Sequence, residues 1–377
     1  MSAVNNQASF LVSSGEPQEI ANTAWAAATL NHPSPTLFKE IDKCSPALVS
    51  SGTPQAVANL AWAFAKMATP APSLFLEIEK QAPRILQQCR MPADISQMAW
   101  AAATLGHASP ALFREIETRS SFLVAEGKPQ EIANTAWAAA TLGHASPVLF
   151  REIETRADFL VKDGTPQNIA NTAWAYGKLR YDAPKLLDAV DEQSEILIKS
   201  GTTQNVSNVA LAFAEIGHNP ASFFNCLEKQ ENCSEFVRRA KDQDIGNVSW
   251  SLVTLGLASE NEALLRALWR RAVETDASKF TSEALKQLVQ VDVHARASGA
   301  ELTPAPPGLK KRMIQAAKAQ TNTGGRFEDD YSALLAQAGF KHEREVQFLE
   351  GDYADFLAID FACKERKIAV EFDLHIT

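Results

Sequence analysis

Residues Gln130 to Phe150 read QEIANTAWAAATLGHASPVLF, and close copies of this stretch recur along roughly the first two thirds of the 377-residue chain. A tryptophan marks the register of each copy, with leucine in its place once: Trp25, Trp62, Trp100, Trp137, Trp174, Leu211 and Trp250. Successive positions are 37 to 39 residues apart. Seven registers at nearly one period are typical of solenoids, in which each repeat packs only against its neighbours.

Each repeat is predicted to hold two helical segments. The first begins at a proline, whose missing N–H would be unpaired in an opening turn, and ends near a glycine that can take the left-handed cap. The prolines are Pro17, Pro54, Pro129 and Pro166, and the glycines are Gly106, Gly143, Gly217 and Gly256. The second begins with a serine N-cap at Ser109-Pro110 and Ser146-Pro147, and its LFREIETR motif predicts ion pairs of Glu115 with Arg119 and Glu152 with Arg156. The predicted fold class is an all-α solenoid of helical hairpin repeats of about 37 residues over residues 8–260.

The tryptophans are predicted to belong to the core. On a helical wheel, the packing surface of the first segment holds Ile20, Ala21, Ala24, Ala28 and Leu30 and their equivalents. Alanines let adjacent helices approach closely, and an indole at the same place in nearly every repeat suits the space between layers better than a base-stacking surface. Four histidines that follow the first segment are whole repeats apart, so they cannot converge on a metal and are predicted as loop residues: His32, His107, His144 and His218.

Two rows of amides accompany the tryptophans, one turn apart on one side of the helix. Three residues before the register stand Asn22, Asn59, Gln97, Asn134, Asn171, Asn208 and Asn247. Seven residues before it stand Gln18, Gln55, Gln130, Gln167, Gln204 and Gln243, with Ala93 breaking the row. Amides that recur in every repeat can bind a repeating backbone without reading sequence. The alternative is a structural ladder that ties neighbouring repeats together, because buried polar groups must be paired.

Three further rows vary between repeats and are therefore candidates for selectivity, as in readers that take one base per repeat. The row six residues before the register runs Glu19, Ala56, Asp94, Glu131, Asn168, Asn205, Asp244. The row two residues after it runs Ala27, Phe64, Ala102, Ala139, Tyr176, Phe213, Leu252, and the row four after it runs Thr29, Lys66, Thr104, Thr141, Lys178, Glu215, Thr254. Neutral drift of a solenoid surface is the alternative.

Composition excludes several classes of protein. With 46% hydrophobic and 21% charged residues the chain is typical of a soluble globular protein, and its apolar runs are too short to span a membrane. The five cysteines form no CxxC pair, which predicts free thiols in a reducing compartment. The first residues of this sequence show neither the apolar core of a signal peptide nor an Arg-rich amphipathic presequence, and Ser9 to Val12 matches Ser121 to Val124. The sequence thus opens inside a repeat: either earlier repeats and a targeting segment are missing, or the solenoid starts with a half repeat.

Charge is unevenly spread along the chain. The net charge is −9, but residues 261–326 hold 11 Lys and Arg against 6 Asp and Glu, whereas the flanking regions are acidic. We predict capping helices over 261–300, including one at Glu262 to Val273, and a basic linker over 301–326 that contains TPAPP. If nucleic acid binds, phosphate attraction is expected to be strongest in this basic stretch, the alternative being a solvated linker.

The motifs PQEIANTAWAAATLG and SPxLFREI, over about residues 8 to 260, resemble the helical repeats of the octotricopeptide class, which also occur in FAST kinase-like proteins and kinetoplastid RNA-editing accessory factors. The resemblance implies a protein that acts in organelles on RNA stability, processing, editing or translation. It implies no particular base-reading residues.

From Phe327 the pattern changes to a helix over 327–338 and three strands over 346–349, 356–362 and 368–372. Phe327-Glu328, Ala358-Ile359-Asp360 and KIAVEFD at 367–373 resemble the start of a RAP domain, a presumed RNA-binding unit related in fold to restriction endonucleases. We predict a small, incomplete α/β module of this kind over 327–377.

Asp360, Glu371 and Asp373 alternate onto one face of adjacent predicted strands and have the chemistry to hold Mg²⁺. Nucleases of this fold place a lysine two residues after the glutamate, where this chain has Asp373. We therefore predict no enzymatic activity, no metal and no cofactor, and keep a metal-dependent endonuclease as the remote alternative.

The sequence as a whole predicts a monomeric organellar RNA-binding protein, mitochondrial or chloroplast, that holds single-stranded RNA on its repeats, with other RNA-processing proteins as further partners and no membrane contact. A protein-binding scaffold is the alternative. The predicted RNA-binding residues are the amides Gln18, Asn22, Gln55, Asn59, Gln130, Asn134, Gln167, Asn171, Gln204, Asn208, Gln243 and Asn247, and the cations Lys66, Lys178, Arg270, Arg271, Lys310, Lys311 and Arg312.

Overall fold

The structure is a computed structural model that describes residues 7–298 and 300–319 and the backbone of three strands at 343–347, 358–363 and 368–370. The chain forms two compact bodies, an N-terminal body up to Asn232 and a C-terminal body from Cys233. Each is described by itself. None of the helices in the described ranges is long and apolar enough to cross a membrane.

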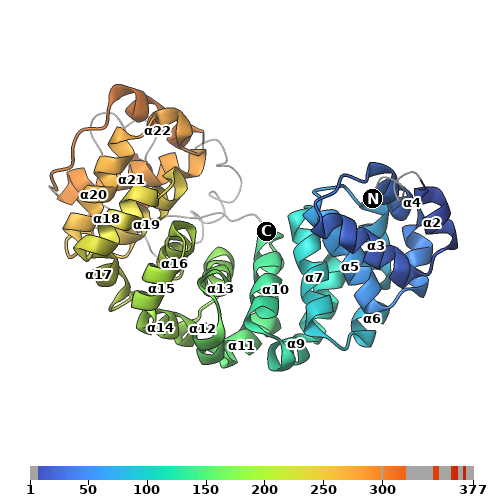
Figure 1. Cartoon of the computed structure of the whole chain (residues 1–377). Helices are drawn as coiled ribbons and strands as arrows, with labels where there is room; N and C mark the ends of the chain where they lie inside the picture. The colour runs from blue at the N-terminus through green and yellow to red at the C-terminus, as the bar shows by residue number, and fades with distance from the viewer. Residues whose placement is uncertain (1–6, 299, 320–342, 348–357, 364–367, 371–377) are drawn as a thin grey trace. The chain divides into compact units, whose positions relative to one another are not determined.

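The N-terminal body is an α-solenoid of two layers, as the repeats predict (Figure 1). The first helices of repeats 1 to 6 stack side by side in one layer: α3 (Pro17–Thr29), α5 (Pro54–Lys66), α7 (Pro92–Thr104), α10 (Pro129–Thr141), α13 (Pro166–Leu179) and α16 (Thr203–Ile216). The other layer, called here the second-helix layer, contains α2 (Ala8–Ser14), α4 (Pro35–Ser51), α6 (Pro72–Gln88), α8 (Pro110–Thr118), α9 (Ser120–Glu126), α11 (Pro147–Thr155), α12 (Ala157–Asp163), α14 (Pro184–Glu192), α15 (Ser194–Ser200) and α17 (Phe223–Glu228). Helix α18 (Gln230–Arg239) spans the boundary between the bodies.

The second segment is longer than predicted and is divided in repeats 3 to 5. Helices α8 and α9 meet at Arg119, and α11 and α12 meet at Arg156. In repeats 1 and 2 the segment stays one helix, but Pro46 and Pro83 lie just after the equivalent place. Proline suits the first turn of a helix, so the same junction is marked in the sequence even where the helix runs through it.

The predicted helix starts and ends are confirmed. Prolines open α3, α5, α10 and α13. Glycines follow the first helices in the left-handed conformation, with φ from 70° to 76° at Gly106, Gly143, Gly217 and Gly256. Elsewhere Asn31, Ala68 and Arg180 take that conformation, with φ of 48° to 54°. Of these residues, Ala68 has neither glycine's freedom nor a polar side chain that compensates locally.

The N-termini of the second helices are capped from the neighbouring repeat. Ser109 and Ser146 occupy the N-cap positions as predicted, but neither side chain makes a capping hydrogen bond. A carboxylate from the preceding repeat accepts the free backbone N–H groups instead: Glu79 accepts from Leu112 at 3.1 Å and Glu117 from Val148 at 2.8 Å. The whole row is Asp42, Glu79, Glu117, Glu154 and Asp191. These carboxylates therefore join successive repeats and complement the positive end of each helix dipole.

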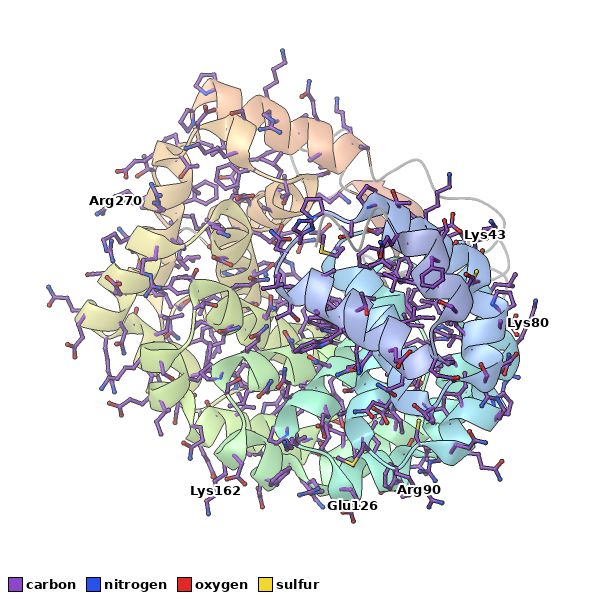
Figure 2. All side chains as sticks on the ribbon, turned by 45° about the vertical axis from the view of Figure 1, so that its right-hand side comes forward. Lys43, Lys80, Arg90, Glu126, Lys162 and Arg270 are labelled. Carbon is purple, nitrogen blue, oxygen red and sulfur yellow. The ribbon has the colours of Figure 1, made fainter. Side chains whose placement is uncertain are left out.

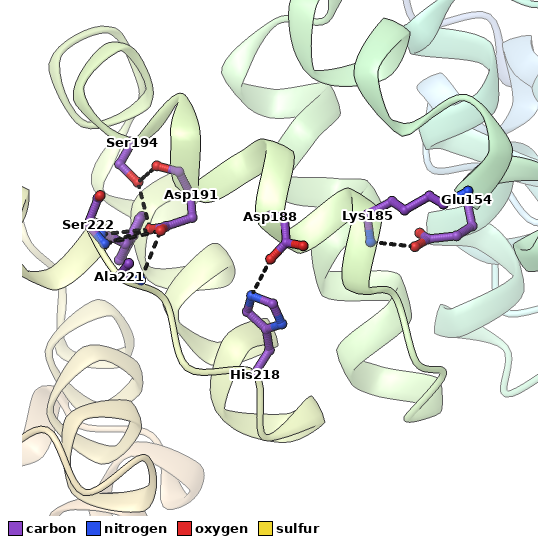
Figure 3. A network of polar contacts seen from close by, with 9 residues as sticks. Glu154, Lys185, Asp188, Asp191, Ser194, His218, Ala221 and Ser222 are labelled. Atoms are coloured by element: carbon purple, nitrogen blue, oxygen red, sulfur yellow. Dashed lines mark hydrogen bonds and ion pairs between the residues drawn. The ribbon is translucent and has the colours of Figure 1, made fainter.

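Asp191 makes the most extensive of these caps (Figure 3). Its carboxylate accepts from the backbone N–H of Ala221 at 2.9 Å, Ser222 at 3.1 Å and Phe223 at 2.8 Å. The same carboxylate contacts the hydroxyl of Ser194 at 3.3 Å. Figure 3 also shows Glu154 bonded to the backbone N–H of Lys185, and Asp188 paired with His218 on the solvent side.

The predicted ion pairs of Arg119 with Glu115 and Arg156 with Glu152 are wrong: the described residues contain no such contact. Arg119 donates to the backbone oxygen of Cys89 at 2.9 Å, and Arg156 donates to Val124 and Ala125, in both cases at the end of the preceding second-layer segment. A guanidinium stabilises the negative end of a helix dipole. These arginines therefore contact the preceding repeat and do not form the local i,i+4 pairs. Together, the arginines and the carboxylates connect each second-layer segment to both of its neighbours along the solenoid.

Alanines of the first helices and phenylalanines of the second build the core. Phe38, Phe75, Phe113 and Phe150 are each no more than 2% exposed. The predicted loop position of the histidines is confirmed, and two of them stack on the phenylalanine of the preceding repeat. His107 lies 4.4 Å from Phe75 and His144 lies 4.5 Å from Phe113, ring centroid to ring centroid. Cys89 is buried and Cys44, Cys226 and Cys233 are partly buried, all as free thiols.

In the C-terminal body the repeat pattern continues further than predicted. Helices α19 (Asp242–Thr254) and α21 (Ser282–Ser298) lie side by side as first helices do, and α22 (Pro307–Lys318) packs on α21 as a second helix does. The predicted helix at Glu262 to Val273 is α20 (Glu262–Glu274), and the 3₁₀ helix η1 (Ala277–Lys279) follows it. Part of the predicted linker over 301–326 is thus α22, whose Leu309 and Met313 are buried. The eighth repeat was missed because Gln290 stands at its register position, 40 residues after Trp250.

Three strands form one antiparallel sheet in the order β1 (Glu343–Gln347), β2 (Ala358–Cys363), β3 (Ile368–Val370). Phe361 pairs with both Arg344 of β1 and Val370 of β3. Strands β1, β2 and β3 overlap the three predicted strands. The predicted helix over 327–338, Glu371 and Asp373 lie outside the described residues, so the predicted magnesium ligands cannot be placed together.

Candidate nucleic-acid interface

Four positions of each first helix share one face: those seven and three residues before the register, the register itself, and four residues after it. In α10 they are Gln130, Asn134, Trp137 and Thr141, which are all exposed or half-buried, while most other positions of that helix are buried. The same four positions in α3, α5, α7, α10, α13 and α16 form what we call the first-helix band. Because these helices stack side by side, the band runs from repeat to repeat along the N-terminal body.

The prediction that the register tryptophans are core residues is wrong for the band. Trp25 is 44% exposed, and Trp62, Trp100, Trp137 and Trp174 are half-buried. The alanines beside them fill the interior: Ala136, Ala139 and Ala140, for example, are at most 1% exposed. The spacing contained the signal, since a residue three positions after one amide row and seven after the other must lie on their face.

Two of the three variable rows have structural roles. The row six residues before the register supplies helix caps: Glu131 accepts from the backbone N–H of Lys128 at 2.9 Å, and Asn168 accepts from that of Thr165 at 3.1 Å. The row two residues after the register is buried throughout, with Phe64 and Tyr176 at 0% and 1% exposure. The prediction of selectivity is therefore wrong for the buried row. For the capping row, in which Glu19 is exposed and Glu131, Asn168 and Asn205 are half-buried, it stays a prediction.

The third variable row, four residues after the register, remains on the band. Threonine occupies it in repeats 1, 3 and 4, and Lys66 and Lys178 occupy it in repeats 2 and 5, all exposed. In repeat 6 Glu215 stands there and pairs with Arg180 at 3.5 Å, which neutralises its charge. The band thus carries two free positive charges and no unpaired negative charge among its described residues.

The amide ladder that we considered as an alternative exists at the ends of the repeat array. In repeat 1 Gln18 donates to Asn22 at 3.0 Å and accepts from Thr53 of the next repeat at 3.3 Å. In the C-terminal body Gln243 donates to Asn247 at 2.8 Å, and Gln287 of the eighth repeat also donates to Asn247 at 3.0 Å. There the amides link adjacent helices.

The amides of repeats 2, 4, 5 and 6 differ from those at the ends. Within the described part of the chain, no hydrogen bond is formed by the side-chain amides of Gln55, Asn59, Gln130, Asn134, Gln167, Asn171, Gln204 and Asn208. All eight are exposed or half-buried. In repeat 3 the side-chain oxygen of Gln97 is buried without a partner. The centre of the band therefore presents amide donors and acceptors whose bonding capacity is open to a ligand.

The predicted basic residues of the C-terminal body lie on two helices. Arg270 and Arg271 are on α20, and Lys310, Lys311 and Arg312 are on α22. Arg270 and Lys311 are exposed. Arg312 is half-buried, and its guanidinium donates to the backbone oxygen of Phe280 at 3.3 Å. This side chain therefore also stabilises the packing of α22.

Part of the acidic charge of the N-terminal body lies in the second-helix layer, away from the band. The carboxylates of the inter-repeat row are occupied by backbone N–H groups in the second-helix layer. Figure 2 shows charged side chains such as Lys43, Lys80 and Glu126 extending outward from that layer. Exposed charges beyond a Debye length of about 8 Å are largely screened, so the net charge of the whole chain does not by itself decide how the first-helix band interacts with a polyanion.

One acid near the band has an altered pKa. Burial, with a contribution from the nearby charge of Glu131, raises the pKa of Asp94 to about 6. Burial also raises the pKa of the neighbouring Cys89 thiol to about 12, with Asp94 adding to the effect, so that this thiol is unreactive at neutral pH. The described residues contain no group of three or more His, Cys, Asp or Glu placed to hold a metal ion.

The fold and this face define the class: the chain is a helical-repeat protein of the α-solenoid type, with a polar and aromatic band on its first helices. Residues 15–261, about two thirds of the chain, match the profile of the family described as RNA-editing substrate-binding complex 6 protein. The chain therefore belongs to this family. The curated proteins contain no match to it.

Proposed function

We propose that this protein binds single-stranded RNA and acts in organellar RNA processing as a non-catalytic member of an RNA-editing type of complex. The family description supports the assignment to RNA editing. The observation that carries RNA binding is the first-helix band, where unpaired amides of the central repeats lie in rows along a face without free negative charge. Such rows suit a ligand whose backbone repeats.

Within this proposal the amides and cations have separate roles. Asn59, Asn134, Asn171 and Asn208, with the glutamines one turn before them, hydrogen-bond sugar and base edges. Lys66 and Lys178 neutralise phosphates on the band, and Arg270, Arg271, Lys310, Lys311 and Arg312 do so in the C-terminal body. Gln18, Asn22, Gln243 and Asn247 contribute least, because they are already paired.

The strands of the C-terminal body belong, in this proposal, to a RAP-like RNA-binding module that assists the solenoid. The antiparallel order and the resemblance of residues 358–360 and 367–373 support it. The location that fits an RNA-editing complex is the mitochondrion, and the word complex in the family description supports protein partners beside the RNA.

Fluorescence anisotropy with the full chain and random-sequence single-stranded RNA tests the proposal. We expect a dissociation constant below about 1 μM at low salt that weakens as salt rises, with a slope of about −0.7 per phosphate neutralised. Lys311→Ala and Arg270→Ala are expected to reduce that slope. No salt-sensitive binding in this range contradicts the proposal, particularly if partner proteins are still captured after nuclease treatment.

Amide variants separate band contacts from fold effects. Asn134→Ala removes an unpaired amide of a central repeat, and Asn22→Ala removes a paired one at the end of the array. We expect the first to weaken RNA binding about fivefold with little change in thermal stability, since a net hydrogen bond is worth about 1 kcal/mol. The second is the matched control, with little effect on binding. Equal losses for both contradict the assignment of the central amides.

A further inference from the structure

We propose that the indoles of Trp25, Trp62, Trp100, Trp137 and Trp174 form a base-stacking platform that holds a weakly stacked RNA strand without reading its sequence. This inference rests on the proposed RNA binding and specifies how the band achieves it. Base stacking on an aromatic side chain needs an exposed ring face beside polar groups that hold the backbone.

The indoles are accessible on the surface of the band, as a base-stacking platform requires. Each is exposed or half-buried on the same face as the amides, and none of the other aromatic residues of these first helices is exposed: Phe64, Tyr176 and Phe213 are buried. The indoles thus occur at one height on successive helices, flanked on one side by an asparagine or glutamine and on the other by threonine or lysine. An aromatic ring between amides and a cation offers stacking, base-edge hydrogen bonds and one phosphate contact in each such repeat.

The spacing of the indoles bears on which RNA strands can stack on them. The ring centroids of Trp25 and Trp62 are 6.2 Å apart and the planes are tilted by 32°. Neighbouring bases in a stacked strand are about 3.4 Å apart. Bases that stack on Trp25 and on Trp62 therefore cannot stay stacked on each other. The platform selects strands that unstack at low cost, so runs of uracil are favoured over runs of adenine.

The rows that vary between repeats show whether the band has side chains that could read base identity. The two variable rows that differ most in chemistry are a row of helix caps and a buried row. What remains on the band is nearly the same in repeats 1 to 5: one or two amides, an indole, and threonine or lysine. Stacking on an indole accepts any base, because every base has a π face. The band consequently distinguishes strand flexibility and not base identity.

The chain contains its own control for the role of the indole. Leu211 stands at the register of repeat 6 and is half-buried there, on helix α16, which packs against α13 as the other first helices pack against one another. A leucine at this position is thus compatible with the fold. Trp100→Leu and Trp137→Leu remove ring faces while keeping a side chain that the solenoid already accepts, and Leu211→Trp adds a ring face.

The test measures the affinity of the full chain for oligo(U), oligo(A) and a mixed single strand of equal length, for the wild type, the Trp100→Leu/Trp137→Leu double variant and Leu211→Trp. We expect the double variant to lose at least about thirtyfold in affinity for oligo(U) and for the mixed strand alike, since each of the two lost base contacts is worth about 1–3 kcal/mol. Leu211→Trp is expected to bind both more tightly, and the wild type to prefer oligo(U) to oligo(A).

The outcomes separate the two proposals. If the wild type binds no RNA, the proposed function fails and this inference fails with it. If the wild type binds RNA but a folded double variant and Leu211→Trp bind as the wild type does, the platform is wrong while the proposed function stands. A loss confined to one sequence, or a preference for oligo(A), also overturns it. If the double variant has a lowered melting temperature, Leu211→Trp decides alone.

Discussion

The inter-repeat cap at Asp191 gives the sharpest prediction about stability. Asp191→Ala removes a carboxylate that is 9% exposed and that accepts the backbone N–H groups of Ala221, Ser222 and Phe223. An N-cap is worth about 1 kcal/mol, and a buried N–H that loses its partner costs about 1–3 kcal/mol. Ala221 and Ser222 are exposed, so their N–H groups can hydrogen-bond to water in the variant. Phe223 is buried, so the full cost of an unpaired buried N–H applies to this residue alone. We therefore expect Asp191→Ala to lower the free energy of unfolding by about 2–4 kcal/mol.

Urea unfolding of the full chain, followed by circular dichroism, measures this loss, and hydrogen exchange of the amides at residues 221–223 locates it. The matched control is Asp188→Ala on the same helix, where the carboxylate is 68% exposed and pairs with His218 at 3.3 Å. An exposed pair is worth about 1 kcal/mol at most. If Asp191→Ala is no less stable than Asp188→Ala, or if exchange at 221–223 is unchanged, the inter-repeat carboxylates do not lock the second-helix layer.

Three further predictions concern single residues. Ala68→Gly is expected to stabilise the chain by about 1 kcal/mol because Ala68 has φ of 48°, and Gly143→Ala to destabilise it by a similar amount because Gly143 has φ of 70°; thermal melts check both. Asp94→Asn is expected to stabilise the chain at pH 7.5 by on the order of 2 kcal/mol. The pKa of Asp94 in the folded chain, about 6, lies above the ordinary value of 3.8, so the advantage of the variant shrinks as pH falls from 7 to 4, and a pH-independent difference contradicts the assignment. Arg156→Ala is expected to cost about 1–2 kcal/mol, and Arg151→Ala, an exposed neighbour, much less; equal urea midpoints contradict the inter-repeat role of Arg156.

The sequence period was sufficient to predict the solenoid, the ends of its first helices and the starts of its second helices. Proline and glycine at fixed places act through local backbone geometry, and local geometry can be read without knowing the neighbours. The inter-repeat caps could not be assigned in the same way. Glu79 and Glu117 are visible as a periodic row, but whether such a carboxylate faces water, a lysine on its own helix or the next repeat depends on packing. The eighth repeat escaped detection because Gln290 replaces the tryptophan.

The exposure of the tryptophans is the main error of the sequence reading. Tryptophan is usually well buried, and a ring that recurs in every repeat suits packing, so composition favoured the core. The helical spacing from Asn134 to Trp137 to Thr141 pointed to the solvent face instead. Where residue type and position on the helix disagree, the position decides, because the alanine-rich face already fills the interior between these helices.

The central claim is that the first-helix band binds single-stranded RNA. The most direct measurement is ultraviolet cross-linking of the full chain to 4-thiouridine-containing single-stranded RNA, with the cross-linked peptides identified by mass spectrometry. The account predicts cross-links in peptides that contain Trp100, Trp137 or Trp174, which an unlabelled single strand competes away and a duplex does not. Cross-links confined to the second-helix layer, or none at all, would contradict it.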